Sequence, residues 1–329
     1  MHKVLIGLNT YNDLSLLRES LPALEELRQT LPADVVVLDT AWNDGVHDFI
    51  RKKYPAFKYL RHPEKNIGYG RSYNEILRKN PEHKYLLVVT SDILLDTSVV
   101  KEFVKRMDAD PKLAMCAGKL YHWDLENGRK TNTIDSLGIV AEKRHHFYDR
   151  GHGEVDTGQY DDELNGTFGI SGAVFLIRTS VIPHLHGKDW QLFDERMWMY
   201  KEDIDLSYRL RWMGAKIEIF PEVWGWHART VANKEGHSLL SLTKADRKKR
   251  EYGRLNSYKN HFLLLKNNFT WRYGPLVLGR VVFYECLKGA YVLLRHPKVF
   301  WAGLKTLLFV KGKGSARAIS PREMLSYFD

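Results

Sequence analysis

Three acidic side chains lie within four positions of this 329-residue sequence, at Glu202, Asp203 and Asp205. Apolar residues follow them at helical spacing, which predicts that the acids lie at the N-terminus of a helix. The helix dipole and the unpaired N–H groups stabilise carboxylates at that end. An ionised carboxylate held there can act as a general base. The alternative is a structural cap in which Asp205 pairs with Arg209, four residues further on.

Four polar segments follow predicted strands and could bind a ligand, because open α/β sheets bind ligands at the carboxyl ends of their strands. The third segment contains glycines, which let the backbone approach a ligand closely, and it leads into a helix N-terminus, where anions bind. A carboxylate at the end of the fourth could hold a hard divalent cation. The segments are Asn9–Asn12, Asp39–Gly45, Asn66–Asn74 and Thr90–Asp92.

Alternating strands and helices must position these segments. Short β-branched runs at Val4–Leu8 and Val35–Leu38 flank a helical pattern over Leu14–Leu31. The alternation predicts a Rossmann-like α/β fold, with a mainly parallel sheet and helices on both faces. Residues 121–168 are polar and predict hairpins and loops. Further strands are expected at Phe57–Arg61, Tyr85–Val89, Leu113–Lys119, Ala173–Arg178 and Lys216–Phe220, and further helices at Ser72–Arg78 and Val99–Met107.

Charge divides the chain into two parts. Residues 1–243 contain 32 Lys+Arg and 35 Asp+Glu, a net charge of −3. Residues 244–329 contain 18 Lys+Arg and 5 Asp+Glu, a net charge of +13, so that the whole chain carries +10. We therefore expect a catalytic domain over residues 1–243 and a basic helical region over residues 244–329. A basic region favours a polyanionic partner, such as a membrane surface, a nucleic acid or a phosphate-rich substrate.

The basic region is rich in aromatic residues, but none of its apolar runs approaches the roughly 20 residues that span a bilayer. Cationic amphipathic helices with aromatic anchors lie in the membrane interface, so the pattern predicts binding to an anionic membrane surface. The alternative is a helical cap over the sheet or a homodimer contact. No signal peptide opens the sequence, and its two cysteines match no metal or redox spacing. We expect a cytoplasmic protein, peripheral on the inner face of the plasma membrane.

These motifs together resemble the family 2 glycosyltransferases of the GT-A fold, from about Lys3 to His227. One element of that family, N-x-G-[FY]-[GA]-x-[GAS]-x-N, is matched in full by Asn66–Asn74. The most specific match is E-D-x-D-L-x-x-R-L-x-x-x-G at Glu202–Gly214. A T-Y-N-like turn and a V-D-N-x-S-x-D-G element are matched, the second loosely, by Thr10–Asn12 and Leu38–Gly45.

The resemblance implies an inverting glycosyltransferase in which Asp203 is the general base and Glu202 orients the acceptor. It also implies a divalent cation, Mg²⁺ or Mn²⁺, bound by Asp92 and His227 on the donor diphosphate. Residues implied to bind the nucleotide sugar are Thr10, Tyr11, Asn12, Asp39 (at the nucleobase), Asn66, Gly68, Gly70, Arg71, Asn74, Ser91 and Asp92. Residues implied on the acceptor side are Gly172, Trp198, Glu202, Trp224 and Trp226.

The chain departs from the family at the metal motif, which is usually D-x-D but here is Thr90-Ser91-Asp92. Metal binding then depends more on His227 and on the diphosphate itself. Within the family the chain resembles bacterial rhamnosyltransferases, which implies dTDP-rhamnose as the donor and a lipid-linked glycan or polysaccharide as the acceptor. A UDP- or GDP-sugar is the alternative donor.

An alternative of another class is a non-enzymatic nucleic-acid-binding protein that uses the basic tail. The sequence has no zinc, helix-turn-helix or RNP-like signature, and the predicted sheet edge is lined by acids. We therefore expect no nucleic-acid partner.

Overall fold

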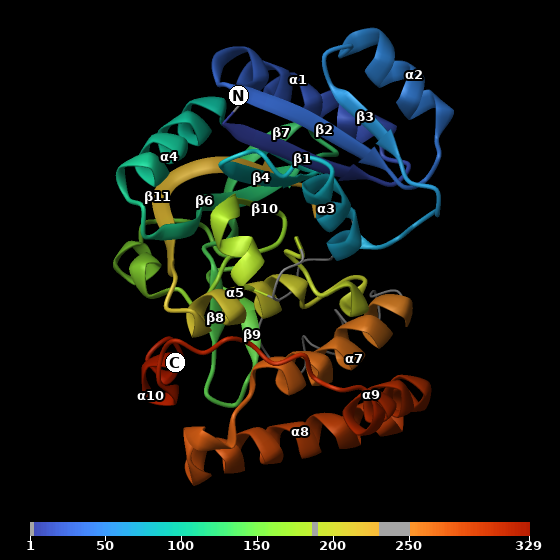
Figure 1. Cartoon of the computed structure of the whole chain (residues 1–329). Helices are drawn as coiled ribbons and strands as arrows, with labels where there is room; N and C mark the ends of the chain where they lie inside the picture. Colours follow the sequence, from blue (N-terminus) through green and yellow to red (C-terminus); the bar gives the residue numbers. More distant parts are fainter. Residues whose placement is uncertain (1–2, 186–189, 230–250) are drawn as a thin grey trace.

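The computed structural model describes residues 3–185, 190–229 and 251–329. A nine-stranded mixed sheet forms its centre, in the order β3-β2-β1-β4-β10-β6-β11-β5, with β7 paired to β6 (Figure 1). The strands are β1 (Val4–Thr10), β2 (Ala33–Asp39), β3 (Lys58–Arg61), β4 (Tyr85–Thr90), β5 (Ile93–Leu95), β6 (Leu113–Asp124), β7 (Arg129–Ser136), β10 (Val174–Arg178) and β11 (Lys216–His227).

The first half of the sheet is parallel, as predicted. Strand β1 pairs in parallel with both β2 and β4, and its end aligns Thr10 with Asp39 and Asn9 with Thr90. The polar segments after these strands therefore meet at one edge of the sheet. The flanking helices are α1 (Leu14–Thr30), α2 (Asp44–Lys53), α3 (Tyr69–Arg78) and α4 (Thr97–Ala109).

Helix α2 was not predicted from the sequence. It begins where the side chain of Asn43 accepts hydrogen bonds from the backbone N–H groups of Gly45 and Val46, at 2.9 and 3.3 Å. An asparagine at this position satisfies N–H groups that the helix itself cannot. The signal was present in the sequence, within a segment that was interpreted only as a ligand-binding turn.

Residues 121–168 form the predicted hairpins and loops. Strands β6 and β7 make a long antiparallel ribbon, and β8 (Ile139–Ala141) pairs with β9 (Phe147–Asp149) in a separate two-stranded hairpin. Short 3₁₀ helices complete the chain between the larger elements: η1 (Asp161–Gly166), η2 (Thr179–His184), η3 (Glu195–Met197) and η4 (Trp271–Tyr273).

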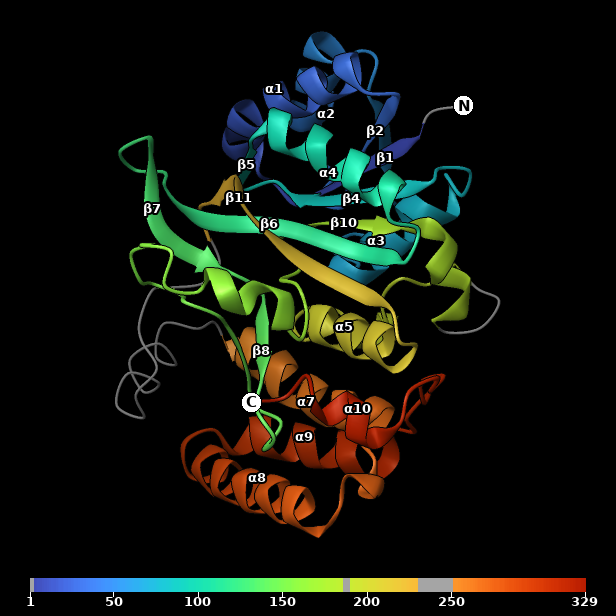
Figure 2. The same cartoon turned by 90° about the vertical axis from the view of Figure 1, so that its left-hand side faces the viewer.

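The C-terminal helices lie beneath α5 (Glu202–Trp212), on the side away from α1 and α2 (Figures 1 and 2). Residues of α7, α8 and α10 share one hydrophobic cluster with α5, in which Tyr208 and Trp212 pack with Leu264, Tyr273 and Met324. The predicted boundary at residue 243 lies outside the described residues. These helices are α7 (Glu251–Asn268), α8 (Pro275–Arg295), α9 (Pro297–Phe309) and α10 (Pro321–Leu325). Of the helices described here, none is both long and apolar enough to cross a bilayer.

Candidate active site

Asp203 lies in the first turn of α5, as the sequence predicted. Its Oδ2 accepts a hydrogen bond of 3.0 Å from the backbone N–H of Gly172, and its Oδ1 accepts one of 2.8 Å from the N–H of Ile204. Burial raises the pKa of Asp203, and the N–H group of Gly172 opposes that rise because it stabilises the ionised form. A carboxylate with a raised pKa is a stronger base than a free aspartate.

The two acids beside Asp203 have different environments. Glu202 is 8% exposed, and its Oε2 has no hydrogen-bond partner. Burial, together with the nearby charge of Asp203, raises the pKa of Glu202 to about 8. The raised pKa favours the protonated form of Glu202, and a protonated carboxyl group can donate a hydrogen bond.

Asp205, in contrast, is fully buried and serves the fold. Its Oδ2 accepts a hydrogen bond of 2.7 Å from Arg209, which confirms the predicted (i, i+4) pair. Its Oδ1 accepts from the side-chain amides of Asn267 and Asn268 on α7, at 3.2 and 2.8 Å. Asp205 thus ties α5 to α7.

The glycine-containing loop before α3 is attached directly to the segment before α5. The N–H of Tyr69 donates to the carbonyl of Trp198 at 2.8 Å, and the indole N–H of Trp198 donates to the carbonyl of Asn66 at 3.1 Å. Gly68 has φ +84°, and a Cβ there would lie 2.4 Å from the Trp198 carbonyl oxygen. Only glycine fits this contact.

The hydroxyl of Tyr69 continues this connection by donating to the carbonyl of Gly172. Since the N–H of Gly172 binds Asp203, the loop at Asn66–Gly70 and the candidate base are linked through one run of hydrogen bonds. The structure thus brings together four of the predicted positions: Asn66, Gly68, Trp198 and Gly172.

Three residues of α3 that were predicted to bind the donor make structural contacts instead. The buried side chain of Asn74 donates to the Phe193 carbonyl and accepts from the Phe193 N–H, at 2.9 and 3.0 Å. Gly70 packs against the same residue, because a Cβ there would lie 2.9 Å from the Cβ of Phe193. Arg71 pairs with Glu64 at 2.9 Å. In this structure these residues hold α3 against its neighbours.

At the sheet edge formed by the ends of β1 and β2, Asp39 makes structural contacts. Asp39 is fully buried, and its oxygens accept hydrogen bonds from the N–H groups of Ala41, Trp42 and Asn43 and from the hydroxyl of Tyr59. Its carboxylate therefore shapes its own loop in this structure.

Other side chains at this edge are accessible. Tyr11 is 51% exposed and Trp42 is 39% exposed, with the ammonium group of Lys65 at 4.8 Å from the centre of a Trp42 ring. Thr10 is buried, whereas Asn12, in the left-handed region at φ 65°, contacts the Asn43 side chain. The sequence signal for Trp42 was its place inside the predicted segment Asp39–Gly45.

Asp92 and His227 meet at the end of β11. Asp92 Oδ2 lies 3.3 Å from His227 Nε2, and His227 Nδ1 lies 2.8 Å from Asp135 Oδ2. Burial alone would lower the pKa of His227, but the carboxylates of Asp92 and Asp135 outweigh it and raise that pKa to about 10. Ser91 donates to Asp13 at 2.8 Å beside this pair.

These residues fit a divalent cation as a site with two protein ligands. A carboxylate oxygen and an imidazole nitrogen 3.3 Å apart can bind one ion in place of the proton on His227, and Asp135 is placed to orient the imidazole from its far side. The described part of the chain contains no group of three His, Cys, Asp or Glu side chains arranged for a metal. The remaining ligands of such an ion would have to come from the substrate and from water.

Three residues that connect this pair to the base were not predicted from the sequence. Arg229 binds Asp135 and also Asp149 Oδ2, the latter at 2.7 Å. Asp149 in turn raises the pKa of Asp203 by its charge, and the ammonium group of Lys201 lowers it. Asp135, Asp149 and Arg229 are far apart in the sequence, so no local spacing could have indicated them.

Two of the predicted acceptor-side tryptophans lie elsewhere. Trp224 is fully buried against Phe103, with ring centroids 5.4 Å apart, so its ring packs in the core. Trp226 donates to the Thr131 carbonyl at 3.1 Å and has Lys130 over its ring, so it packs on β7. Of the three, only Trp198 adjoins the candidate base.

The fold and the site together define the class of this protein. A curled mixed sheet whose first half is parallel, with flanking helices and polar segments at one edge, matches the GT-A fold of glycosyltransferases. The sequence model described as Glycosyl transferase family 2 matches residues 6–181, just over half of the chain. The chain belongs to this family and is a glycosyltransferase. The alternative of a non-enzymatic nucleic-acid-binding protein is thereby removed.

Solved structures agree in fold. The mannosyltransferase PcManGT from Pyrobaculum calidifontis, in complex with GDP-Man and Mn²⁺, has a TM-score of 0.52 and 17% identity, covering 92% of this chain and 73% of that one. TarS residues 1–349 from S. aureus have a TM-score of 0.55 and 14% identity, covering 93% and 80%. GalNAc-T7 with UDP, GalNAc and Mn²⁺ has a TM-score of 0.56 and 11% identity, covering 83% of this chain and 49% of that one. No curated protein matches the chain in sequence.

Proposed function

We propose that this glycosyltransferase moves a sugar from a nucleoside diphosphate donor to an acceptor hydroxyl with inversion. The observation that carries the proposal is the position of Asp203, which the Gly172 N–H fixes beside the loop Asn66–Gly70. In the reaction, Asp203 takes the proton of the acceptor hydroxyl as its oxygen attacks the anomeric carbon. The bond to the diphosphate breaks on the opposite face of the sugar, and no covalent enzyme intermediate is needed. Protonated Glu202 donates a hydrogen bond to the acceptor.

A divalent cation held by Asp92 and His227 would neutralise charge on the leaving diphosphate. Mn²⁺ in the structures of PcManGT and GalNAc-T7 supports this assignment. Ser91 and the N-terminus of α3 would contact the diphosphate as well. The N–H groups at a helix N-terminus favour an anion. Mg²⁺ is the alternative ion.

For the donor we propose dTDP-rhamnose, on the motif resemblance described above. GDP- and UDP-sugars are the alternatives, and they are favoured by the GDP-Man and UDP-GlcNAc complexes of the structural neighbours. Since Asp39 is occupied by its own loop, we assign contact with the base to Tyr11 and Trp42.

For the acceptor we propose a lipid-linked glycan or polysaccharide, reached from the inner face of the plasma membrane. The support is an apolar face of α8 and α9 that is exposed, with Leu276 80%, Phe283 67% and Phe309 76% accessible. Exposed apolar patches of this kind mark membrane or protein contacts. A homodimer through the same face is the alternative.

A donor screen tests the proposal. Thermal shift and nucleoside diphosphate release are measured with dTDP-, UDP- and GDP-sugars, each with Mg²⁺, with Mn²⁺ and with EDTA. We expect one nucleotide class to stabilise the protein, and the metal to strengthen that effect. If no sugar nucleotide binds under any of these conditions, the proposal fails.

A further inference from the structure

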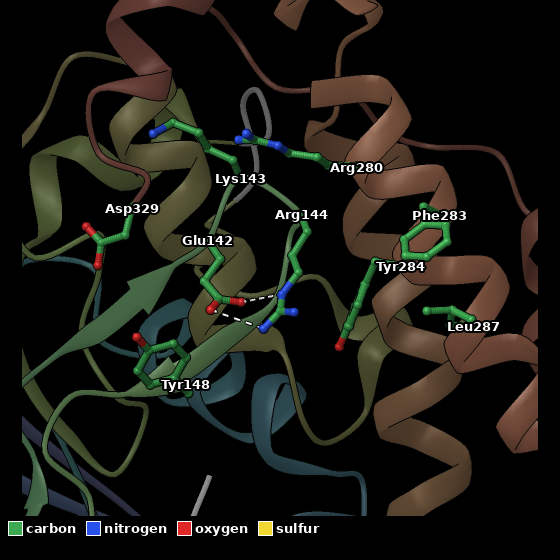
Figure 3. A pocket seen from close by; sticks show the side chains of 9 residues that line it. All are labelled: Glu142, Lys143, Arg144, Tyr148, Arg280, Phe283, Tyr284, Leu287 and Asp329. Atoms are coloured by element: carbon green, nitrogen blue, oxygen red, sulfur yellow. Dashed lines mark hydrogen bonds and ion pairs between the residues drawn. The ribbon is translucent and has the colours of Figure 1, made fainter. Parts of the chain in front are cut away.

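A pocket of about 440 Å³ lies between the β8–β9 hairpin and α8, apart from the candidate active site (Figure 3). None of its lining residues belongs to the active site described above. The hairpin contributes Glu142, Lys143, Arg144 and Tyr148, α8 contributes Arg280, Phe283, Tyr284 and Leu287, and Asp329 completes the wall.

The charges in this pocket do not balance. Glu142 accepts hydrogen bonds of 2.6 and 3.2 Å from Arg144, and Asp329 lies 3.9 Å from Arg150. Glu142 is thus paired with Arg144, whereas Arg150, which lies outside the lining, is shared between Asp329 and Glu163. Lys143 and Arg280 form no side-chain hydrogen bond or ion pair with the residues that the structure describes, and Figure 3 shows their charged ends on the same side of the pocket. The lining carries three cations and two carboxylates, and two cations without an ion pair on one rim favour an anion.

One wall of the pocket is held together by side-chain contacts. The guanidinium group of Arg144 lies 5.3 Å from the centre of the Tyr284 ring, while its nitrogens bind Glu142. A guanidinium held by both a carboxylate and an aromatic face loses little freedom when a ligand binds. The hairpin and α8 are joined by this contact, so the pocket is formed without a ligand.

The other wall is hydrocarbon and continues beyond the pocket. Phe283 is 67% exposed and Leu287 is 57% exposed, and both belong to the outer face of α8, where Leu276 and Leu294 are also exposed. The inner face of the same helix is buried through Val277, Val281 and Val292. An anion site here directly adjoins an apolar surface.

We propose that this groove binds the headgroup of an anionic phospholipid in the bilayer. Lys143 and Arg280 contact the phosphate, and Phe283 and Leu287 contact the first carbons of the lipid chains. A phospholipid carries both features in one molecule, in the order in which the groove presents them. The inference rests on the proposed membrane association and deepens it, because it makes one lipid ligand, and not only surface charge, responsible for holding α8 on the membrane.

The test compares two pairs of substitutions in the full chain. The groove pair is Lys143→Ala with Arg280→Ala. The matched control is Arg272→Ala with Lys298→Ala, two exposed cations near the ends of α8 that do not line the pocket. Binding is measured by co-sedimentation with phosphatidylcholine vesicles, with and without phosphatidylglycerol. A surface potential alone weakens binding by roughly fivefold for each charge removed, equally in both pairs.

We expect the groove pair to lose at least about tenfold more affinity for phosphatidylglycerol vesicles than the control pair. We also expect short-chain dihexanoyl-phosphatidylglycerol, below its micelle concentration, to bind the unmodified chain and not the groove pair. Saturation by inorganic phosphate alone at the same affinity would instead identify a free phosphate site, and would overturn the lipid assignment. Equal losses in the two pairs would overturn it as well.

The outcome is separable from that of the proposed function. Lys143 and Arg280 are outside the catalytic machinery, so nucleoside diphosphate release in solution should be unchanged in the groove pair. Absence of vesicle binding with normal product release would reject the lipid site and the membrane association while leaving glycosyl transfer intact. A chain that dimerises and ignores vesicles would assign the apolar face to a second copy and reject the proposal.

Discussion

The backbone N–H of Gly172 donates to Oδ2 of Asp203 across 3.0 Å, and this bond joins the sheet to the acid-bearing helix. Gly172 precedes β10, while Asp203 lies in the first turn of α5. The carbonyl of Gly172 accepts a hydrogen bond from the hydroxyl of Tyr69, which belongs to the loop Asn66–Gly70. The residue that binds the candidate base thus also binds Tyr69, so the position of Asp203 depends on the segment Asn66–Gly70.

Replacing Asp203 by Asn should abolish transfer while leaving the donor site intact. Asparagine can still accept the Gly172 N–H bond, but it cannot take a proton from the acceptor. We expect the transfer rate to fall by about 10²–10⁴-fold, the usual contribution of a general base. Donor affinity by calorimetry should change by less than about threefold. Retention of full turnover by the variant would show that another group is the base.

Gly68→Ala should disturb the loop Asn66–Gly70 because its new Cβ would lie 2.4 Å from the Trp198 carbonyl oxygen, on a backbone with φ +84°. We expect a loss of about 1–3 kcal/mol of unfolding free energy and a higher KM for the donor. Gly166→Ala is the matched control, because a Cβ there meets no atom within 4 Å. Urea unfolding of both variants checks the prediction, and equal stability of the two would contradict it.

Glu202 should make stability depend on pH in the direction opposite to an ordinary paired carboxylate. Its pKa rises from 4.5 to about 8 in the folded protein, so in that window the folded state holds a proton that the unfolded chain has released. Wild type should therefore lose stability relative to Glu202→Gln as pH rises from 4.5 to 8. Between pH 4.5 and pH 8, we expect the Tm of the variant to rise by several degrees relative to that of wild type, which is on the order expected for a buried charge.

The control for that experiment is the same comparison made at a pH near 4.5, where both proteins carry a neutral side chain at position 202. A Tm difference that stays constant from pH 4.5 to 9 would mean that Glu202 ionises as it does in water.

Metal dependence should rest on Asp92 and, indirectly, on Asp135. Asp92→Asn removes one of two protein ligands, and we expect Mn²⁺-dependent donor binding to weaken by at least about tenfold. Asp135→Asn should weaken it by about 10–100-fold through the orientation of His227, although Asp135 would not touch the ion. Donor titrations with Mn²⁺ and with EDTA measure both effects. Wild-type affinity that is unchanged by EDTA would rule out a role for the ion in donor binding.

Much of this protein could be predicted from the sequence alone because the signals are local. Periodicity located most of the strands and helices, including the parallel pairing of β1, β2 and β4. The spacing from Glu202 to Arg209 predicted both a helix N-terminus and its ion pair, which the structure confirms. Residues at the carboxyl ends of parallel strands share one edge as a matter of topology, so the location of the site followed from the order of the elements.

Only the tertiary structure decided what individual side chains do within that site. Asp39 and Asn74 lie where the motifs predict, yet their polar atoms are bound by their own loop and by Phe193. Trp224 lies three positions from His227 but belongs to the core. Asp135, Asp149 and Arg229 converge on the site from separate elements. Burial and hydrogen-bond saturation depend on neighbours that are distant in the sequence. A local sequence pattern therefore cannot predict them.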